Sequence, residues 1–302
     1  MFARRNVAVG IAIVAVSLAG ATLWLRWNNA RHFTDIRALL SRFPVEDAIV
    51  LNIDFASVRG AGLLADPKAS LEPEYQKFLD GTGFNYRRDL DSVTASFSKS
   101  GNFFIARGRF DWKMLRDYAA HQGGSCYEQL CRMAGSTPDR RISFLPLRDD
   151  TMALAVSTDD LAATRLTKAG DPLKAQLPTA PVWLLVPGSA LHDAAAVPPG
   201  LRLMLSALTN ADRLVVTMGP SGSGLAAKME ATCRSKDEAR LLASQLRNVT
   251  TTLKESMQRD KQAQSDQFLQ VLVGGTFDDN GARVTGTWPF SKALIDGLTS
   301  GI

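Results

Sequence analysis

Val7–Leu25 is an uninterrupted apolar run without a charged side chain, and it constrains this chain more than any other feature. A helix needs about 20 apolar residues to cross the hydrocarbon core of a bilayer. Arg4 and Arg5 precede the run, and Arg26 follows it. We therefore interpret Val7–Leu25 as a single transmembrane helix that anchors the rest of the chain to a lipid bilayer.

Two other interpretations of this run remain open. Ala19-Gly20-Ala21 follows basic residues and an apolar stretch, as in a secretory signal peptide, so the chain could instead be secreted after cleavage near Ala21. A buried core helix is the third interpretation. The uncleaved anchor is favoured because the apolar residues continue to Leu25, and because Trp24 and Trp27 are typical of a membrane interface.

The charges that flank the run predict its orientation only weakly, since arginines lie on both sides of it. The short N-terminal tail and the signal-like layout favour an N-terminus inside the cell. We therefore expect Trp27–Ile302 to be extracytoplasmic, either periplasmic or on the cell surface.

The composition indicates a folded globular chain, with 45% hydrophobic and 22% charged residues. The net charge of +5 is spread along the sequence, with Arg87-Arg88 next to Asp89 and Arg140-Arg141 next to Asp139. A nucleic-acid-binding face would show a basic stripe. We therefore expect no nucleic-acid partner.

The part of the chain beyond the anchor exceeds the usual domain length of about 150 residues, so one large or two small domains are expected. Asn28–Phe43 has apolar residues near the helical period and precedes Pro44, which predicts an amphipathic stalk helix. The order of elements after the stalk repeats, once in residues 44–170 and again in residues 178–302. Each half is predicted to be β-α-β-β-α-β-β-α.

The fold class expected from this repeat is α+β with a mainly antiparallel sheet, built by internal duplication; a coincidental match of a common element order is the alternative. In the first half, strands are expected at 48–54, 92–98, 103–108, 142–147 and 152–156, and helices at 71–79, 112–121 and 159–166. In the second half, strands are expected at 182–186, 213–218, 225–233, 268–273 and 282–287, and helices at 201–208, after Ser235, and at 292–298.

Three cysteines are present, Cys126, Cys131 and Cys233. In an exported chain the close pair Cys126 and Cys131 is a candidate disulfide around a small loop, which would stabilise the fold by about 2 kcal/mol at most. Free thiols, or a metal site that also enlists His121, are the alternatives. The metal alternative has unfamiliar ligand spacing.

No catalytic or cofactor motif is found. Ser189 follows a predicted strand but lacks the G-x-S-x-G pattern of a nucleophile elbow. The glycine-rich segment Gly219–Gly224 lacks the Lys-Ser/Thr pair of a phosphate-binding loop and is interpreted as a hairpin turn. We therefore expect no cofactor, no metal and no catalytic residue.

The most distinctive polar stretch lies between a predicted helix and a predicted strand and combines aromatic, arginine and aspartate side chains, a composition typical of binding hot spots. The residues of this candidate binding loop are Phe84, Tyr86, Arg87, Arg88, Asp89 and Asp91. The alternative is a helix C-cap at Gly81 or Gly83 followed by a core-packed loop with internal Arg–Asp pairs.

These features favour a membrane-anchored, extracytoplasmic binding or assembly protein of the cell envelope, with a protein partner there. One alternative is an envelope hydrolase that uses carboxylates and the Arg87/Arg88 loop. Another is a carrier of lipid or another apolar ligand, which would require an apolar cavity between the halves.

Overall fold

The computed structural model describes residues 35–62, 64, 73–135, 137–171, 176–192, 207–221, 224–259 and 267–290. It divides into two compact units. The first comprises residues up to Phe43 together with Lys168–Ala175, and the second comprises Pro44–Thr167 with Gln176–Ile302.

The described part of the first unit contains one short helix, α2 (Ile36–Leu40). The Asp35 carboxylate caps it by accepting a hydrogen bond from the Arg37 amide at 2.9 Å. The Gly170 amide donates a hydrogen bond to the Ser41 carbonyl, which joins the two chain segments that make up this unit. Within the described part of the expected stalk Asn28–Phe43, the only helix is α2, which spans five residues.

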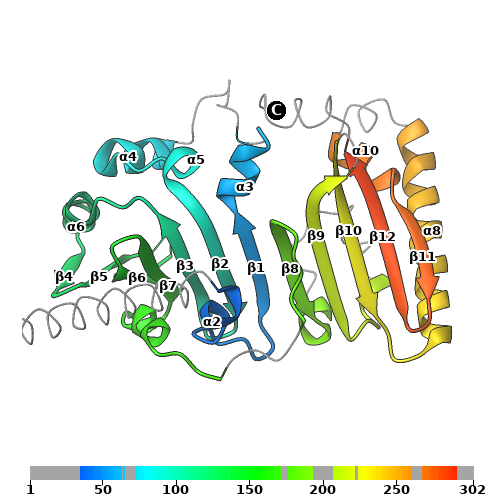
Figure 1. Ribbon diagram of the computed structural model, residues 1–302, viewed down its shortest axis with the longest axis horizontal. Helices are drawn as coiled ribbons and strands as arrows, with labels where there is room; N and C mark the ends of the chain where they lie inside the picture. The colour runs from blue at the N-terminus through cyan, green and yellow to red at the C-terminus, as the bar shows by residue number, and fades with distance from the viewer. Residues whose placement is uncertain are drawn as a thin grey trace, which may run out of the picture. The chain divides into compact units, whose positions relative to one another are not determined.

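The second unit is built on one sheet of twelve strands, shown in Figure 1, in which every pairing is antiparallel. The order across the sheet is β11-β12-β10-β9-β8-β1-β2-β3-β7-β6-β5-β4. The strands are β1 (Ile49–Asp54), β2 (Leu90–Ser98), β3 (Gly101–Gly108), β4 (Ser125–Tyr127), β5 (Leu130–Ala134), β6 (Arg141–Arg148), β7 (Thr151–Ser157), β8 (Val182–Pro187), β9 (Arg213–Ser221), β10 (Gly224–Thr232), β11 (Thr276–Asn280) and β12 (Arg283–Phe290). The predicted α+β class with a mainly antiparallel sheet is confirmed.

Within the described residues, this unit contains six α-helices and two 3₁₀ turns, and α6 and α8 cover one face of the sheet. The helices and turns are α3 (Phe55–Gly60), α4 (Pro73–Thr82), α5 (Tyr86–Asp89), α6 (Trp112–His121), the 3₁₀ turns η1 (Ala162–Thr167) and η2 (Gly188–His192), α8 (Lys236–Arg259) and α10 (Gln267–Val273). Local capping fixes where the covering helices begin. The Asp111 carboxylate accepts from the Lys113 and Met114 amides, and the Ser235 hydroxyl accepts from the Glu238 amide.

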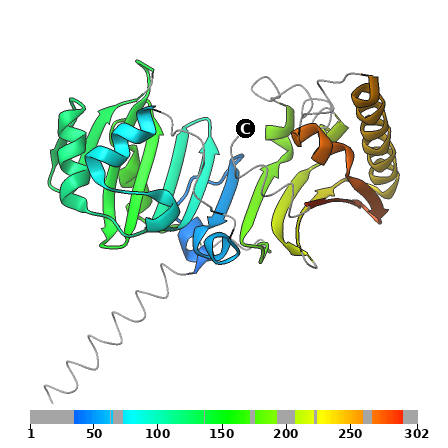
Figure 2. The same cartoon turned by 90° about the horizontal axis from the view of Figure 1, so that it is seen from above.

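Helices α6 and α8 cover the same face of the sheet. Residues directly opposite one another on neighbouring strands point to the same face. One row of such pairs crosses all twelve strands: Phe277, Gly286, Met229, Val216, Leu184, Leu51, Ala95, Phe104, Leu154, Phe144, Cys131 and Cys126. One end of this row packs into a core with α8, seen beside β11 in Figure 2, and the other end packs into a core with α6.

One predicted strand is wrong. Residues 268–273 lie in the helix α10, and the strand that pairs with β12 is β11, which begins at Thr276. The run Phe268–Val273 is short and apolar, and such a run fits a buried helix as well as a strand. The turn between β11 and β12 has Gly281 in the left-handed region at φ +60°, which glycine adopts without strain.

The segment around the cysteines was expected to be a loop and is instead the hairpin β4–β5, which extends the sheet at one edge. The expected helix at 159–166 is the 3₁₀ turn η1. Several predictions fall wholly or partly outside the described residues: the run Val7–Leu25 with its cleavage site near Ala21, residues 28–34 of the stalk, residues 201–206 of the helix expected at 201–208, and the last helix expected at 292–298.

Across the ranges that the structure describes, no helix combines the length and the apolar composition that crossing a membrane requires. The assignment of residues 44–170 and 178–302 to two halves stays a prediction.

Candidate binding site

The candidate binding loop begins where α4 ends. Gly83 follows the last residue of α4 with φ +65°, a left-handed conformation that glycine adopts without strain, and its amide donates to the Leu79 carbonyl at 2.7 Å. The Thr82 hydroxyl, which is buried, accepts from the Phe84 amide at 3.2 Å. The chain therefore turns sharply into α5 and then into β2.

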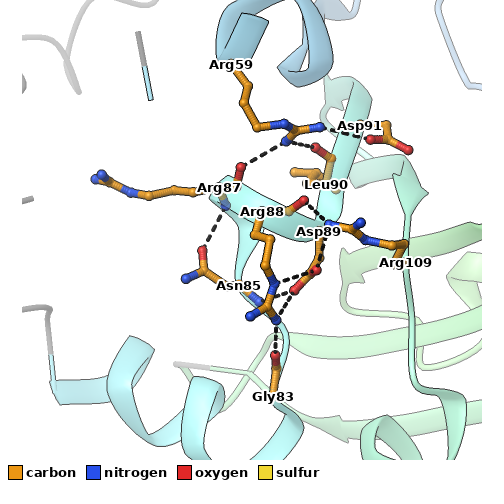
Figure 3. Close-up of polar contacts among 9 residues, drawn as sticks. All are labelled: Arg59, Gly83, Asn85, Arg87, Arg88, Asp89, Leu90, Asp91 and Arg109. Carbon is orange, nitrogen blue, oxygen red and sulfur yellow. Dashed lines mark hydrogen bonds and ion pairs between the residues drawn. The ribbon is translucent and has the colours of Figure 1, made fainter. Parts of the chain in front are cut away.

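Asp89 is the centre of the loop, with a side chain only 9% exposed. Its carboxylate accepts hydrogen bonds from the Arg88 side chain at 2.7 and 2.9 Å and from the Asn85 amide at 3.0 Å. The guanidinium of Arg109, from the end of β3, lies 3.2 Å from the same carboxylate. Figure 3 shows these groups converging on Asp89. The alternative of internal Arg–Asp pairing therefore describes this part of the loop.

The hydrogen bonds from Arg88 lower the pKa of the Asp89 carboxyl below the 3.8 of an unperturbed aspartate, and the Asn85 amide and the charge of Arg109 act in the same direction. Burial opposes this shift but is outweighed. At neutral pH the Asp89 carboxylate is therefore ionised and serves as the fixed anion that holds the loop against β3.

Replacing Asp89 with Asn is expected to lower the free energy of unfolding by about 2 kcal/mol at about pH 7, because the amide cannot satisfy the two arginines. The sign of the pH dependence follows from the lowered pKa. The stabilisation from Asp89 is complete above the unfolded-state pKa and is lost as the pH falls through the lower folded-state pKa. Urea unfolding of both proteins at about pH 7 and about pH 3 should therefore show the difference shrinking in acid.

Asp91→Asn is the matched control. The Asp91 side chain is 53% exposed and pairs with Arg59 at 3.1 Å, so its loss should change stability by less than about 1 kcal/mol. Equal effects of the two substitutions, or a difference for Asp89→Asn that is unchanged in acid, would contradict this account of the loop.

Arg59 fixes the opposite side of the loop from α3. Its guanidinium donates to the carbonyls of Arg87 and Leu90, each at 2.9 Å (Figure 3). Tyr86 packs on this side too, edge-on to the Phe55 and Tyr75 rings. The Arg59 hydrogen bonds tie α3 to the backbone of α5 and to the start of β2, so these contacts are structural.

Phe84 points to a different group of rings. It stacks on Phe110 with centroids 5.3 Å apart and planes 14° from parallel, and Phe110 contacts Trp112 at 5.4 Å. The Trp112 indole N–H donates to the Asp149 carbonyl at 2.9 Å, which fixes the ring beside the β6–β7 turn. These three half-buried rings form an aromatic wall at the start of α6.

The aromatic wall lines an open hollow of about 850 Å³. Among the side chains around it are the exposed Met114, the arginines 88 and 109, and four carboxylates, which are Asp89, Asp111, Asp149 and Asp150. Three of these carboxylates have local partners. Asp89 pairs with the two arginines, and Asp111 accepts from the first amides of α6. Asp150 accepts from the Thr151 hydroxyl at 2.9 Å. We call this the aromatic hollow.

Close backbone approach shapes the floor of the aromatic hollow at Gly108. A Cβ atom there would lie 2.3 Å from the Asp89 carbonyl oxygen and 3.1 Å from the Leu90 Cα. The Arg109 amide then donates to that same Asp89 carbonyl at 2.8 Å. Glycine at 108 is therefore what lets β3 bring Arg109 onto the loop.

No family model matches the sequence, and no curated protein matches it. The chain is similar to crystal structures of TP0453. Crystal form III has a TM-score of 0.46 with 11% identity, covering 87% of this chain and 98% of that one; form I has 0.45 with 9%, covering 86% and 96%. Crystal form IV has 0.44 with 11%, covering 86% and 96%.

The structure separates the residues of the candidate binding loop into two groups. Phe84, Arg88 and Asp89 line the aromatic hollow, whereas Tyr86, Arg87 and Asp91 do not. Sequence reasoning missed the contributions of β3, α6 and the β6–β7 turn. The available signal was the segment Arg109–Trp112, which repeats the aromatic, arginine and aspartate composition of the loop.

The two close cysteines, Cys126 and Cys131, face each other across the β4–β5 hairpin and form a disulfide in the structure, while Cys233 is a buried free thiol. Within the described ranges no group of three His, Cys, Asp or Glu side chains lies close enough to hold a metal ion.

Proposed function

We propose that this chain is a non-enzymatic binding or assembly protein of the cell envelope. In this proposal Val7–Leu25 anchors it in the bilayer with the N-terminus inside, and the domain beyond Trp27 is extracytoplasmic. The observation that carries the binding function is the aromatic hollow, in which Phe84, Phe110 and Trp112 form an open wall edged by charged groups.

The chemistry of the aromatic hollow favours a protein partner. Rings that are held rigidly bring large contact areas at little cost in side-chain entropy, and interface hot spots are enriched in aromatic residues and arginine. The side chains of Arg88 and Arg109 stay 65% and 69% exposed while paired with Asp89, so they remain available to a partner at the rim.

A hydrolase that uses the acidic residues and the Arg87/Arg88 loop is less well supported. A catalytic acid needs a pKa raised toward the working pH. The pKa of the Asp89 carboxyl is instead lowered by Arg88, and Asp111 is engaged in capping α6. These carboxylates act as structural anions.

We also propose that the second unit arose by internal duplication. Strands β1-β2-β3-β7-β6 and strands β8-β9-β10-β12-β11 follow the same spatial order, outward from the β1–β8 pairing. In each set a helix, α6 or α8, follows the third strand along the chain and packs on the same face of the sheet. The hairpin β4–β5 would then be an addition to the first copy.

The binding proposal can be tested by photo-crosslinking in intact cells. A photoreactive amino acid at Met114, at the rim of the aromatic hollow, should give one discrete adduct, and Phe110→Ala in the same chain should abolish it. The matched control places the photoreactive group at Leu241, which is 58% exposed on α8 and remote in sequence from the hollow. Identical adducts from both positions, or an adduct from Met114 that survives Phe110→Ala, would contradict the proposal.

The proposed topology has its own test. A protease added to cells whose outer barrier has been opened should remove a C-terminal tag before the cells are lysed. Protection of the tag until lysis would place the domain in the cytoplasm and overturn the envelope assignment.

A further inference from the structure

Among the described residues, no helix packs over β9, β10 and β12 on the face of the sheet that points away from α8. Helix α8 packs on Leu214, Ala231 and Val284, and the residues that alternate with these point the other way. Three rows of paired residues cross this face: Arg213, Thr232 and Arg283; Val215, Glu230 and Thr285; Thr217, Lys228 and Thr287. Together with Gln176–Pro178, most of these residues line a hollow of about 400 Å³, which we call the basic hollow.

Positive charge exceeds negative charge among the residues that line the basic hollow. Among the described residues of the lining, the cations are Arg213, Lys228 and Arg283, and the one carboxylate is Glu230. Glu230 lies 3.5 Å from Arg283. The Arg213 side chain donates to the Gln176 carbonyl at 3.4 Å, and within the described part of the chain no carboxylate forms an ion pair with Arg213 or Lys228.

One further acidic group faces the same way. Asp278 of β11 lies opposite Thr285 in the row of Glu230, beyond the lining of the basic hollow. Counting only the described lining residues, two positive charges are left uncompensated. Three threonine hydroxyls in the same lining can act as further hydrogen-bond donors: Thr217, Thr232 and Thr285.

The same face in the other half of the sheet shows that the fold does not require this arrangement. The row of Glu230 continues through Leu185, Val50 and Ser96 to Phe103 of β3, which is 0% exposed. There the turn η1 covers the sheet, and the Ala163 amide donates to the Ser143 hydroxyl of β6. The row of Glu230 is therefore charged where it crosses β10 and apolar and buried where it crosses β3.

We propose that the basic hollow binds a phosphate group, either free or carried as the headgroup of an acidic phospholipid. A phosphomonoester carries close to two negative charges at neutral pH, which matches the uncompensated charge. Guanidinium forks bind phosphate oxygens in bidentate geometry. Because Arg213 and Arg283 flank the strand β10, their side chains can approach one group from two sides, with Thr232 between them.

Calorimetric titration of the full-length chain in non-ionic micelles with inorganic phosphate, at low ionic strength, tests this directly. The variant Arg213→Gln/Lys228→Gln/Arg283→Gln should bind at least about tenfold more weakly, since each charge-assisted contact is stronger than a neutral one. The control Arg116→Gln/Arg240→Gln/Lys254→Gln removes the same charge from exposed helix positions and should bind as the parent does.

Glu230→Gln keeps the proposal testable if the triple variant fails to fold. Removing the one lining carboxylate should tighten phosphate binding by about threefold, because a like charge no longer faces the ligand. Weaker binding by Glu230→Gln, or equal loss in the two triple variants, would overturn the proposal.

Micelles doped with phosphatidic acid distinguish the two sources of phosphate. If the doped micelles displace inorganic phosphate from the parent chain, the ligand is a lipid headgroup at a membrane surface. If they do not, it is a soluble phosphate. Absence of binding to both inorganic phosphate and the doped micelles would overturn the proposal and would leave the aromatic hollow untouched.

Discussion

Leu246→Ala is expected to lower the free energy of unfolding by about 3 kcal/mol, because it opens a cavity that the surrounding core cannot fill. Leu246 is 0% exposed and lies in the cluster that α8 forms with the sheet. The buried residues of α8 recur every three or four positions, at Ala239, Leu242, Ala243, Leu246 and Thr250. The loss at Leu246 therefore measures how firmly α8 is held on the sheet.

Leu241→Ala, in the same helix, is the matched control. Its side chain is 58% exposed, so the same chemical change should cost about 0.5 kcal/mol or less. The helix propensity of the two substitutions is equal, and their difference isolates burial. Urea unfolding measures the free energy of unfolding of both variants, provided that the dependence of this free energy on urea concentration is the same in each. Similar losses at the two positions would mean that α8 does not pack on the sheet through Leu246.

The elements that sequence reasoning located well are those whose pattern is long and periodic. The helix expected after Ser235 is α8, and the Asp111 and Ser235 side chains cap α6 and α8. The strand prediction for Phe268–Val273 was wrong because six apolar or neutral residues fit either a strand or a buried helix. Only the packing against α8 and β12 decides between the two.

The candidate site could be predicted only in part, because its contacts join positions distant in the sequence. Asp89 becomes a buried anion only when β3 brings Arg109 to it, and Phe84 becomes part of a wall only when Phe110 stacks on it. Local composition marked the loop but could not separate Phe84, which lines the aromatic hollow, from Tyr86, which packs against Phe55 and Tyr75.

The strand pairing that joins the proposed halves could not be predicted from the sequence either. Hydrophobic periodicity shows which face of a strand is buried, but not which strand lies next to it. The structure pairs β1 with β8 directly, from Val50 opposite Leu185 to Ile53 opposite Val182. A sheet that continues through such a pairing transmits destabilisation from one side to the other. Two separately folded domains would not.

Trp183→Ala tests that consequence and should lower the free energy of unfolding by about 4 kcal/mol. Trp183 is 2% exposed in β8, where it lies opposite Asn52 of β1 and Thr217 of β9. Native-state hydrogen exchange should then show the amides of β3 and of β12 accelerating by the same factor, because both exchange through one cooperative unfolding event.

Tyr127→Ala, at the 73% exposed ring on the edge strand β4, is the control and should leave both exchange rates near those of the parent. If Trp183→Ala accelerates β12 while β3 stays protected, the second half unfolds by itself and the β1–β8 pairing is a contact between two domains. Equal acceleration means that the proposed halves have become one folding unit, so that a partner bound at the aromatic hollow would stabilise the whole sheet by linkage.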